Sequence, residues 1–334
     1  MKRIDSIQIL RGIGAILILL FHLSFINRGE FAVDIFFCIS GFILMYTTQK
    51  NTDHMLLKRL IRILPLYYIV TFVMFFIIKI IPSLALMSSA NVSYLIKSLF
   101  FIPYVSMGAD SNNYVVPLVS IGWTLNLEMY FYLIFTLANK ISNKNRGLIT
   151  SIILIIVALI GFVVNCNNLI FKFITNSVIL EFVFGIAFFY IYKKLESYSI
   201  NKNWKRISLF LVSIICLLLL WIINGTNIFA EIRILRYGIL AYICFICFVF
   251  ALKDIKIPNN LMFVGKISYS FYYVEFFTSA VVNKLIIINA NTLIVKLFSV
   301  ILSIILTLII SYISWFLIEN KLGKFLSKKF IKTK

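Results

Sequence analysis

The sequence predicts an all-α integral membrane protein, in which about ten transmembrane helices surround a polar cavity inside the membrane and both termini are cytoplasmic. Three observations support this fold class. Of the 334 residues, 62% are hydrophobic and only 13% are charged, which is far less charge than a soluble domain carries. Apolar runs long enough to cross a bilayer recur along the chain. Short basic segments separate these runs.

The positions of the spans follow from the length of helix, about 20 apolar residues, that crosses a bilayer. The sequence predicts spans over residues 5–26, 32–49, 62–82, 119–138, 148–165, 175–192, 207–223, 234–251, 267–288 and 294–318. The run at 92–107 is shorter, and Pro103 and Gly108 interrupt it, so we expect a re-entrant or interfacial segment there. The first span is too long for a cleavable signal peptide, and no small-residue cleavage site follows it.

The basic residues set the orientation of these spans. The chain has 32 lysines and arginines against 12 acidic residues, and its formal net charge is +20. With the N-terminus inside, every predicted cytoplasmic segment is basic, as the positive-inside rule requires. We therefore expect one membrane-embedded domain over residues 1–320 and a basic cytoplasmic tail over 321–334. The expected location is the cytoplasmic membrane of a bacterial cell. The charge favours anionic lipids or phosphate ligands and gives no reason to expect nucleic acid.

The first span contains two residues that hydrocarbon does not favour, Arg11 and His22. Eleven helical residues rise about 16 Å and return to nearly the same face, so the two side chains share one stripe at different depths. Taken singly, Arg11 fits a side chain that extends to the inner interface, and His22 fits a buried histidine satisfied by a neighbour. Together on one stripe, they favour a polar cavity.

The span at 119–138 holds a deep carboxylate, Glu128, within "IGWTLNLEMYFYLIF". A carboxylate at that depth needs a partner, and His22 lies at a compatible depth. By accepting one ring N–H, the carboxylate would leave the other imidazole nitrogen free to act as a base. Four further acidic residues lie in or at the edge of spans, and each fits a structural ion pair as well as it fits a functional role: Asp34, Glu181, Glu275 and Glu319.

The third span opens with "KRLIRILPLYY", in which Arg59 and Arg62 share a helix face at the cytoplasmic mouth. Two adjacent guanidinium groups suit a phosphate or pyrophosphate, although positive-inside charge alone also accounts for them. Pro65 is expected near the start of this helix, where its missing N–H matters least. The five cysteines lie in or beside apolar segments and predict neither a disulfide framework nor a metal site.

Several of these motifs, in this order, resemble the acyltransferase 3 family of multi-pass membrane acyltransferases, and the resemblance spans nearly the whole chain. "LRGIGAILILLFHL" is similar to the family's arginine-then-histidine pattern, and "KRLIRILPLYY" to its Arg-x-x-Arg segment. "WTLNLEMYFY" resembles the Trp-Ser/Thr-Leu-x-x-Glu segment. "FAVDIFFCISGFIL", "GKISYSFYYVEFF" and "WFLIEN" resemble further segments of the family. The chain departs from the pattern at Glu275, where relatives often have histidine, and at Lys321, where proline often follows the late Ile-Glu motif.

The resemblance implies acyl transfer from acyl-CoA, usually acetyl-CoA, to a hydroxyl of a lipid-linked or exported carbohydrate. We expect Arg59, Arg62 and Arg11 to bind acyl-CoA, His22 to act as the base and Glu128 to orient it, with no metal. An acyl-histidine intermediate stays open as an alternative. The remaining candidates have substrate-binding or structural roles, with Thr124 or Tyr130 as oxyanion donors: Asp34, Trp123, Thr124, Tyr130, Ser268, Tyr269 and Glu275.

Two other classes of protein fit parts of this pattern. A multi-pass transporter or exporter of a small anion or glycan unit would use the same buried polar set. However, the two halves of the sequence show no obvious repeat and no matched pair of broken helices. Consumption of acetyl-CoA would distinguish the enzyme from the transporter. A membrane sensor or assembly factor would leave Arg11, His22 and Glu128 without a purpose.

Overall fold

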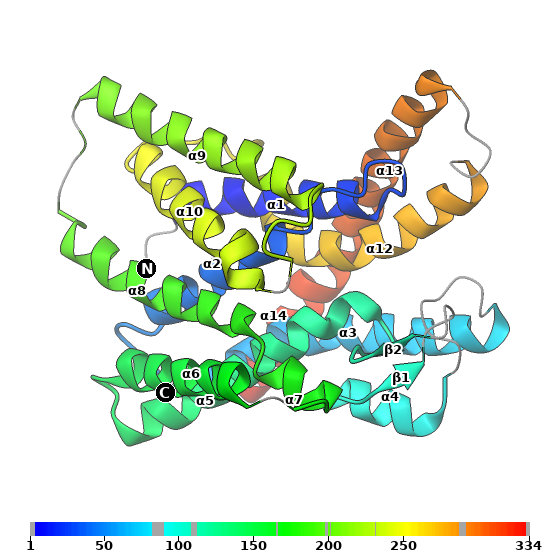
Figure 1. Cartoon of the computed structure of the whole chain (residues 1–334), viewed down its shortest axis with the longest axis horizontal. Helices are drawn as coiled ribbons and strands as arrows, with labels where there is room; N and C mark the ends of the chain where they lie inside the picture. Colours follow the sequence, from blue (N-terminus) through cyan, green and yellow to red (C-terminus); the bar gives the residue numbers. More distant parts are fainter. Residues whose placement is uncertain are drawn as a thin grey trace. The chain divides into compact units, whose positions relative to one another are not determined.

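The computed structural model describes residues 4–81, 90–107, 112–164, 166–197, 200, 202–230, 232–286 and 292–331. These residues are almost entirely helical, which confirms the predicted all-α class (Figure 1). Within the described ranges, the strands are β1 (Ser106–Met107) and β2 (Asn113–Tyr114), which pair antiparallel. The longer helices are α1 (Asp5–His22), α2 (Ala32–Thr47), α3 (Met55–Ile80), α5 (Trp123–Ile141), α6 (Arg146–Val163), α8 (Leu180–Lys194), α9 (Asn203–Asn224), α10 (Ile239–Ala251), α12 (Ser268–Leu285) and α13 (Leu293–Ser314).

Shorter helices connect or extend these elements. They are α4 (Val92–Leu99), α7 (Leu169–Ile174), α11 (Phe263–Lys266) and α14 (Gly323–Phe330). The π-helical segment η4 (Ile234–Gly238) leads into α10, and η6 (Trp315–Leu322) joins α13 to α14. The predicted interruption of the 92–107 run is present, because α4 ends before Pro103. Gly108, the second predicted interruption, lies outside the described residues.

Each predicted span coincides with a helix, but the helices differ in how well they suit a bilayer. Among the described residues, seven helical stretches are long and apolar enough to cross a membrane: Asp5–His22, Met55–Ile80, Arg146–Val163, Leu169–Lys194, Asn203–Asn224, Ile234–Ala251 and Leu293–Phe330. Helix α2 has only 16 residues. The other two predicted spans, α5 and α12, carry Glu128 and Glu275. The chain is thus a multi-pass membrane protein, and ten crossings with cytoplasmic termini stay a prediction.

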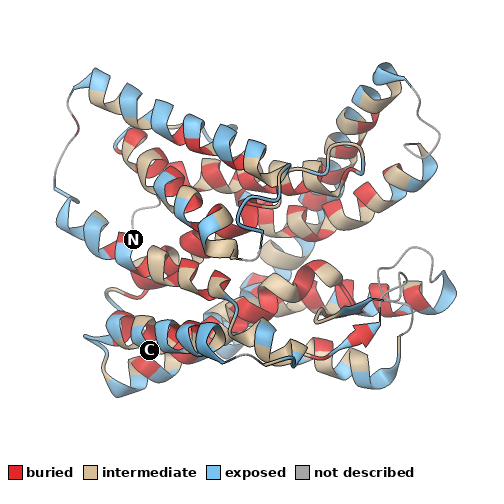
Figure 2. Ribbon diagram, in the orientation of Figure 1, coloured by how far each residue is buried: buried red, intermediate tan, exposed pale blue. Residues whose placement is uncertain are grey.

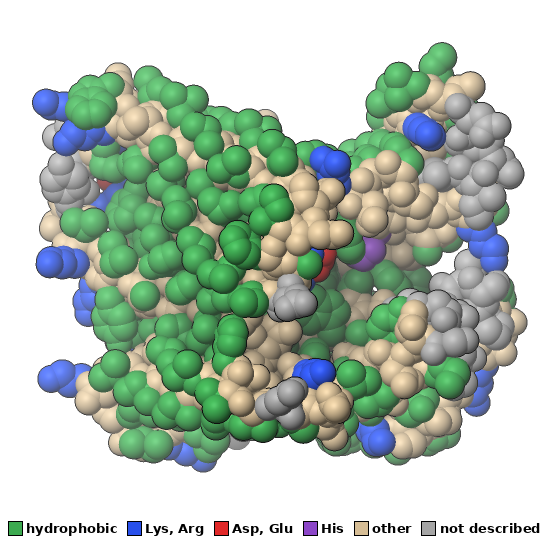
Figure 3. Space-filling view, viewed as in Figure 1, with side chains coloured by type: hydrophobic (Ala, Val, Ile, Leu, Met, Phe, Trp, Pro, Cys, Tyr) green, Lys and Arg blue, Asp and Glu red, His purple; other side chains and the backbone are tan. Residues whose placement is uncertain are grey.

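The burial pattern of α9 and α13 is the reverse of a soluble helix. The residues that α13 buries are small and polar: Ser299, Ser303, Thr307 and Ser311. Its leucines and isoleucines are largely exposed, and α9 likewise exposes most of its apolar side chains (Figure 2). Figure 3 shows hydrophobic side chains over most of the visible face formed by α9 and α10. Small residues between helices and large apolar residues outside are typical of packing in lipid.

The chain divides into two compact units. Unit 1 contains residues Met1–Asn51 and Leu180–Tyr312, and unit 2 contains Thr52–Ile179 and Ile313–Lys334. Each unit is therefore built from two separate stretches of sequence. The division does not follow the expected boundary at residue 320, and the single membrane domain with a basic tail stays a prediction.

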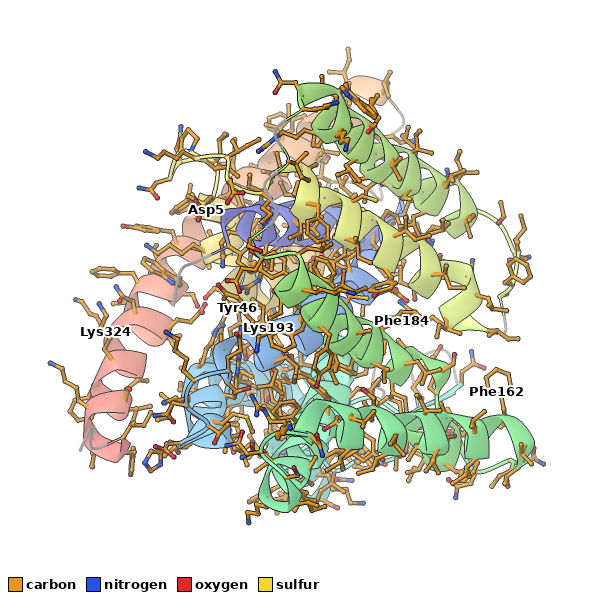
Figure 4. All side chains as sticks on the ribbon, turned by 90° about the vertical axis from the view of Figure 1, so that its left-hand side faces the viewer. Asp5, Tyr46, Phe162, Phe184, Lys193 and Lys324 are labelled. Atoms are coloured by element: carbon orange, nitrogen blue, oxygen red, sulfur yellow. The ribbon has the colours of Figure 1, made fainter. Side chains whose placement is uncertain are left out.

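Glycines allow the helices of unit 1 to pack closely. A Cβ atom on Gly41 of α2 would lie 2.2 Å from the Phe182 carbonyl oxygen, and one on Gly185 of α8 would lie 2.1 Å from that of Cys38. Helices α2 and α8 run in the same direction, so that Tyr46 and Lys193 lie at the same end of the pair (Figure 4). Parallel packing agrees with the predicted order of spans, in which both helices run from outside to inside.

Unit 2 is built on α3, with α5 and α6 forming a helical hairpin. Helix α4 is fixed to α3 through Ser98, whose carbonyl oxygen accepts a hydrogen bond from the Tyr67 hydroxyl at 3.0 Å. The predicted position of Pro65 near the start of its helix is wrong, because α3 begins at Met55 and encloses the proline. Lys58, Arg59 and Arg62 interrupt the apolar residues of its first turns, so a search for an uninterrupted apolar run places the start too late.

Candidate functional site

The imidazole of His22 is held by a carboxylate on a helix of unit 1 that is distant in sequence but packs against α1. His22 is the last residue of α1, and its Nδ1 atom lies 3.0 Å from both carboxylate oxygens of Glu275 on α12. The Glu275 side chain is fully buried, while that of His22 is 21% exposed. The Nδ1–H group therefore donates to Glu275, which leaves Nε2 as the nitrogen that can accept a proton. The rings of Phe21 and Phe276 contact the imidazole edge-to-face.

The backbone around His22 is held by the same helix. The side-chain amide of Asn283 donates to the His22 carbonyl oxygen at 2.7 Å and accepts from the Ser24 N–H at 3.1 Å. Sequence reasoning did not single out Asn283. Its signal was a polar amide eight residues after Glu275 in a predicted span.

The segment that follows α1 is fixed by a second set of polar contacts. Gly29 has a φ of +123°, and a Cβ atom there would lie 2.1 Å from the Leu17 carbonyl oxygen, so only glycine fits. The Asn224 amide oxygen accepts from the N–H groups of Gly29 at 2.7 Å and Glu30 at 3.2 Å. This segment therefore has little freedom to move away from α9.

An arginine that the sequence analysis did not assign completes this part of unit 1. The Arg233 guanidinium donates to Asp34 through Nε at 3.1 Å and Nη2 at 2.8 Å, and it also pairs with Glu30. Asp34 is fully buried, so a forked ion pair compensates its desolvation. The structural ion pair expected as one role for Asp34 is thus present. Glu181 is also fully buried, on the adjacent α8.

In unit 2, Tyr132 links the predicted residues Arg59 and Glu128. The Tyr132 hydroxyl donates a short hydrogen bond to Glu128 Oε1 on the same face of α5. The Arg59 guanidinium carbon lies 5.8 Å from the centroid of the Tyr132 ring, a cation–π contact. Arg59 is half-buried and Arg62 is exposed. Glu128 and His22 lie in different units, and their predicted pairing stays a prediction.

The remaining predicted residues occupy less central positions. Arg11 is half-buried on α1, as are Trp123 and Tyr130 on α5. The Thr124 hydroxyl donates to the Ile121 carbonyl oxygen at 3.0 Å. At the start of α12, Ser268 is buried, and the half-buried Tyr269 packs its ring edge-to-face on Tyr273.

Comparisons with known proteins identify the family to which the chain belongs. The profile of the acyltransferase domain matches residues 4–316, which is nearly the whole chain. The exopolysaccharide production protein ExoZ of Rhizobium meliloti (strain 1021) is 32% identical over 163 residues, 47% of this chain and 49% of that protein. The match thus spans about half the length of that relative. No solved structure matches the chain. The match to the acyltransferase domain, together with the seven apolar helices, shows that the chain belongs to the acyltransferase 3 family of membrane acyltransferases.

Proposed function

We propose that this protein is a membrane-bound O-acyltransferase that moves an acetyl group from acetyl-CoA to a hydroxyl of a cell-surface or lipid-linked carbohydrate. The observation that carries the proposal is the His22–Glu275 pair, a buried carboxylate on Nδ1 of an imidazole that is itself partly exposed. Membership of the acyltransferase family supports the reaction class. The name of the exopolysaccharide production protein supports a polysaccharide acceptor.

The chemistry requires a base that acts on a neutral hydroxyl. His22 Nε2 removes the hydroxyl proton while the oxygen attacks the thioester carbonyl carbon. The bond between the carbonyl carbon and sulfur then breaks, and the imidazolium returns its proton to the thiolate of CoA. Glu275 keeps Nδ1 protonated and stabilises the imidazolium during the step. In this proposal Glu275 has the role that the sequence analysis expected for Glu128.

The donor phosphates are assigned to Arg59 and Arg62. Both lie within the first eight residues of α3. The exposed Arg62 provides an accessible guanidinium, and the half-buried Arg59 is held against the Tyr132 ring. Glu128 supports this cluster through Tyr132 rather than through contact with the ligand. Arg11 is assigned to the pantetheine end of the donor.

Transfer of radiolabel tests the proposed function. Purified protein in nanodiscs would receive [14C]acetyl-CoA together with surface polysaccharide extracted from the producing cells. We expect label in the polysaccharide and one CoA thiol released for each acetyl group transferred. The His54→Gln variant is the matched control for any change at His22, because the chain has only two histidines and His54 is an exposed residue of unit 2. A transporter would give neither label nor free thiol, and that outcome would refute the proposal.

A further inference from the structure

We propose that Asn283 is a positioning residue that holds His22 through its backbone, so that α12 fixes the imidazole at two separate points. The inference rests on the proposed function only in naming His22 as the base. The hydrogen bonds of Asn283 to this segment go to backbone groups and not to the imidazole. Asn283 contacts the carbonyl oxygen of His22 and the N–H of Ser24 on either side of Leu23.

The position of His22 makes such support necessary. His22 is the last residue of α1, and Leu23 after it is extended, with φ −82° and ψ 114°. The last carbonyls of a helix have no intrahelical partner, and helix ends fray when nothing satisfies them. The amide of Asn283 satisfies the His22 carbonyl at 2.7 Å and at the same time accepts from the N–H of Ser24, the second residue after the helix, at 3.1 Å. Asn283 therefore caps the C-terminal end of α1 with a side chain from another helix.

Helix α12 is suited to act as a rigid support. Glu275 and Asn283 are eight residues apart on it, a rise of about 12 Å. One residue fixes the imidazole ring and the other fixes the backbone from which that ring projects. A side chain held only at Nδ1 could still move when its own Cα atom moves. When both the ring and the backbone of His22 are held, the Nε2 atom keeps one position. Acyl transfer needs that position fixed to within about 0.5 Å.

The chain offers a matched control in Asn224. Its amide also binds the segment after α1, by accepting from the N–H groups of Gly29 and Glu30, and it donates to the Tyr237 hydroxyl at 3.1 Å. It belongs to the same unit and makes at least as many hydrogen bonds as Asn283, but it does not touch His22. Loss of Asn224 therefore reports what general loosening of the segment does.

The test uses four forms of the full protein in nanodiscs, all with His54→Gln so that His22 is the sole histidine: the parent, Asn283→Ala, Asn283→Asp and Asn224→Ala. The first readout is the rate at which diethyl pyrocarbonate modifies His22. The second is kcat and KM for acetyl-CoA, and the third is Tm. Asparagine and aspartate have nearly the same shape, so the aspartate variant keeps the packing but cannot donate to the His22 carbonyl.

We expect both Asn283 variants to raise the modification rate several-fold and to lower kcat by about tenfold to a hundredfold, with KM unchanged. Asn224→Ala should lower Tm at least as much, while the modification rate and kcat stay within twofold of the parent. Equal modification rates in the Asn283 and Asn224 variants would overturn the positioning role. Modification needs no turnover. If the parent proves inactive but diethyl pyrocarbonate still modifies His22 faster in the Asn283 variants than in the parent, the positioning role holds while the proposed function fails.

Discussion

The two polar clusters of this protein differ in how they hold their charges. In unit 1, His22 is bound at its ring by Glu275 and at its backbone by Asn283, and the neighbouring Arg233 is neutralised by acidic partners. In unit 2, the Arg59 guanidinium lies over the Tyr132 ring, whose hydroxyl donates to Glu128, and Arg62 is exposed to solvent. The first cluster is fixed from two sides and its imidazole is partly exposed, whereas the second is open and carries net positive charge.

This difference matches two separate tasks. Proton transfer depends on the geometry of one nitrogen, so its group must be held from several sides. Binding of phosphate depends on positive charge that the ligand can reach. The fixed cluster therefore fits the reaction itself, and the open cluster fits capture of the donor. Substitutions at His22 and Glu275 should change kcat, while those at Arg59 and Arg62 should change the affinity for acetyl-CoA.

The largest effect is expected for the base. His22→Ala removes the proton acceptor, so kcat for transfer of acetyl to polysaccharide should fall by about 10²- to 10⁴-fold. The affinity for acetyl-CoA, measured by equilibrium binding, should stay within twofold because His22 is not in the donor cluster. Wild-type kcat in a well-folded His22→Ala protein would remove His22 from the mechanism.

The next effect concerns the carboxylate behind the base. Glu275→Gln preserves the shape and can still accept from Nδ1–H, but it cannot stabilise an imidazolium by charge. We expect kcat to fall by about 10- to 100-fold, since a buried charge-assisted hydrogen bond contributes about 1.5–3 kcal/mol. Steady-state kinetics and Tm should be measured together. A fall in Tm without any change in kcat would assign Glu275 a structural role only.

The donor cluster should respond in binding rather than in rate. Arg59→Ala and Arg62→Ala each remove one guanidinium, and each should weaken acetyl-CoA by about 1.5–3 kcal/mol, roughly ten- to a hundredfold. Lysine at either position should restore the charge but only part of the affinity, because it lacks the planar fork. Calorimetry in nanodiscs would measure these affinities. If both alanine variants bind acetyl-CoA as tightly as wild type, the donor site lies elsewhere.

The smallest effect should come from Tyr132. Tyr132→Phe keeps the ring on which Arg59 rests but removes the hydrogen bond to Glu128. A single hydrogen bond contributes about 0.5–1.5 kcal/mol, so KM for acetyl-CoA should rise about two- to tenfold while kcat stays constant. A change confined to kcat would instead link Tyr132 and Glu128 to the reaction step.

The sequence predicted the helical class and the positions of the helices because apolar length and periodicity are local properties. It also singled out His22, Arg59 and Arg62 as candidates, since polar residues in apolar runs stand out in sequence, and their roles stay predictions. The partner of His22 was not predictable in this way. Glu128 and Glu275 are both isolated carboxylates in apolar spans, and only the packing of α1 against α12 places Glu275 at the imidazole.

Other contacts were out of reach for the same reason. Arg233 follows Asp34 by 199 residues, and Asn283 follows His22 by 261. No spacing rule joins residues so far apart. The start of α3 was misplaced because Lys58, Arg59 and Arg62 interrupt the apolar residues there, and helix formation does not depend on an uninterrupted apolar run.

The central claim is that His22 acts with Glu275, and a double-mutant comparison of residual acetyl transfer tests it most directly. The rate of His22→Ala would be measured alone, with Glu275→Gln added and with Glu128→Gln added. A residue that acts only through His22 has nothing left to contribute once the imidazole is gone. We therefore predict that Glu275→Gln leaves the residual rate unchanged, whereas Glu128→Gln lowers it several-fold at subsaturating acetyl-CoA. The opposite pattern, in which Glu275→Gln lowers the residual rate and Glu128→Gln has no effect, would contradict the account.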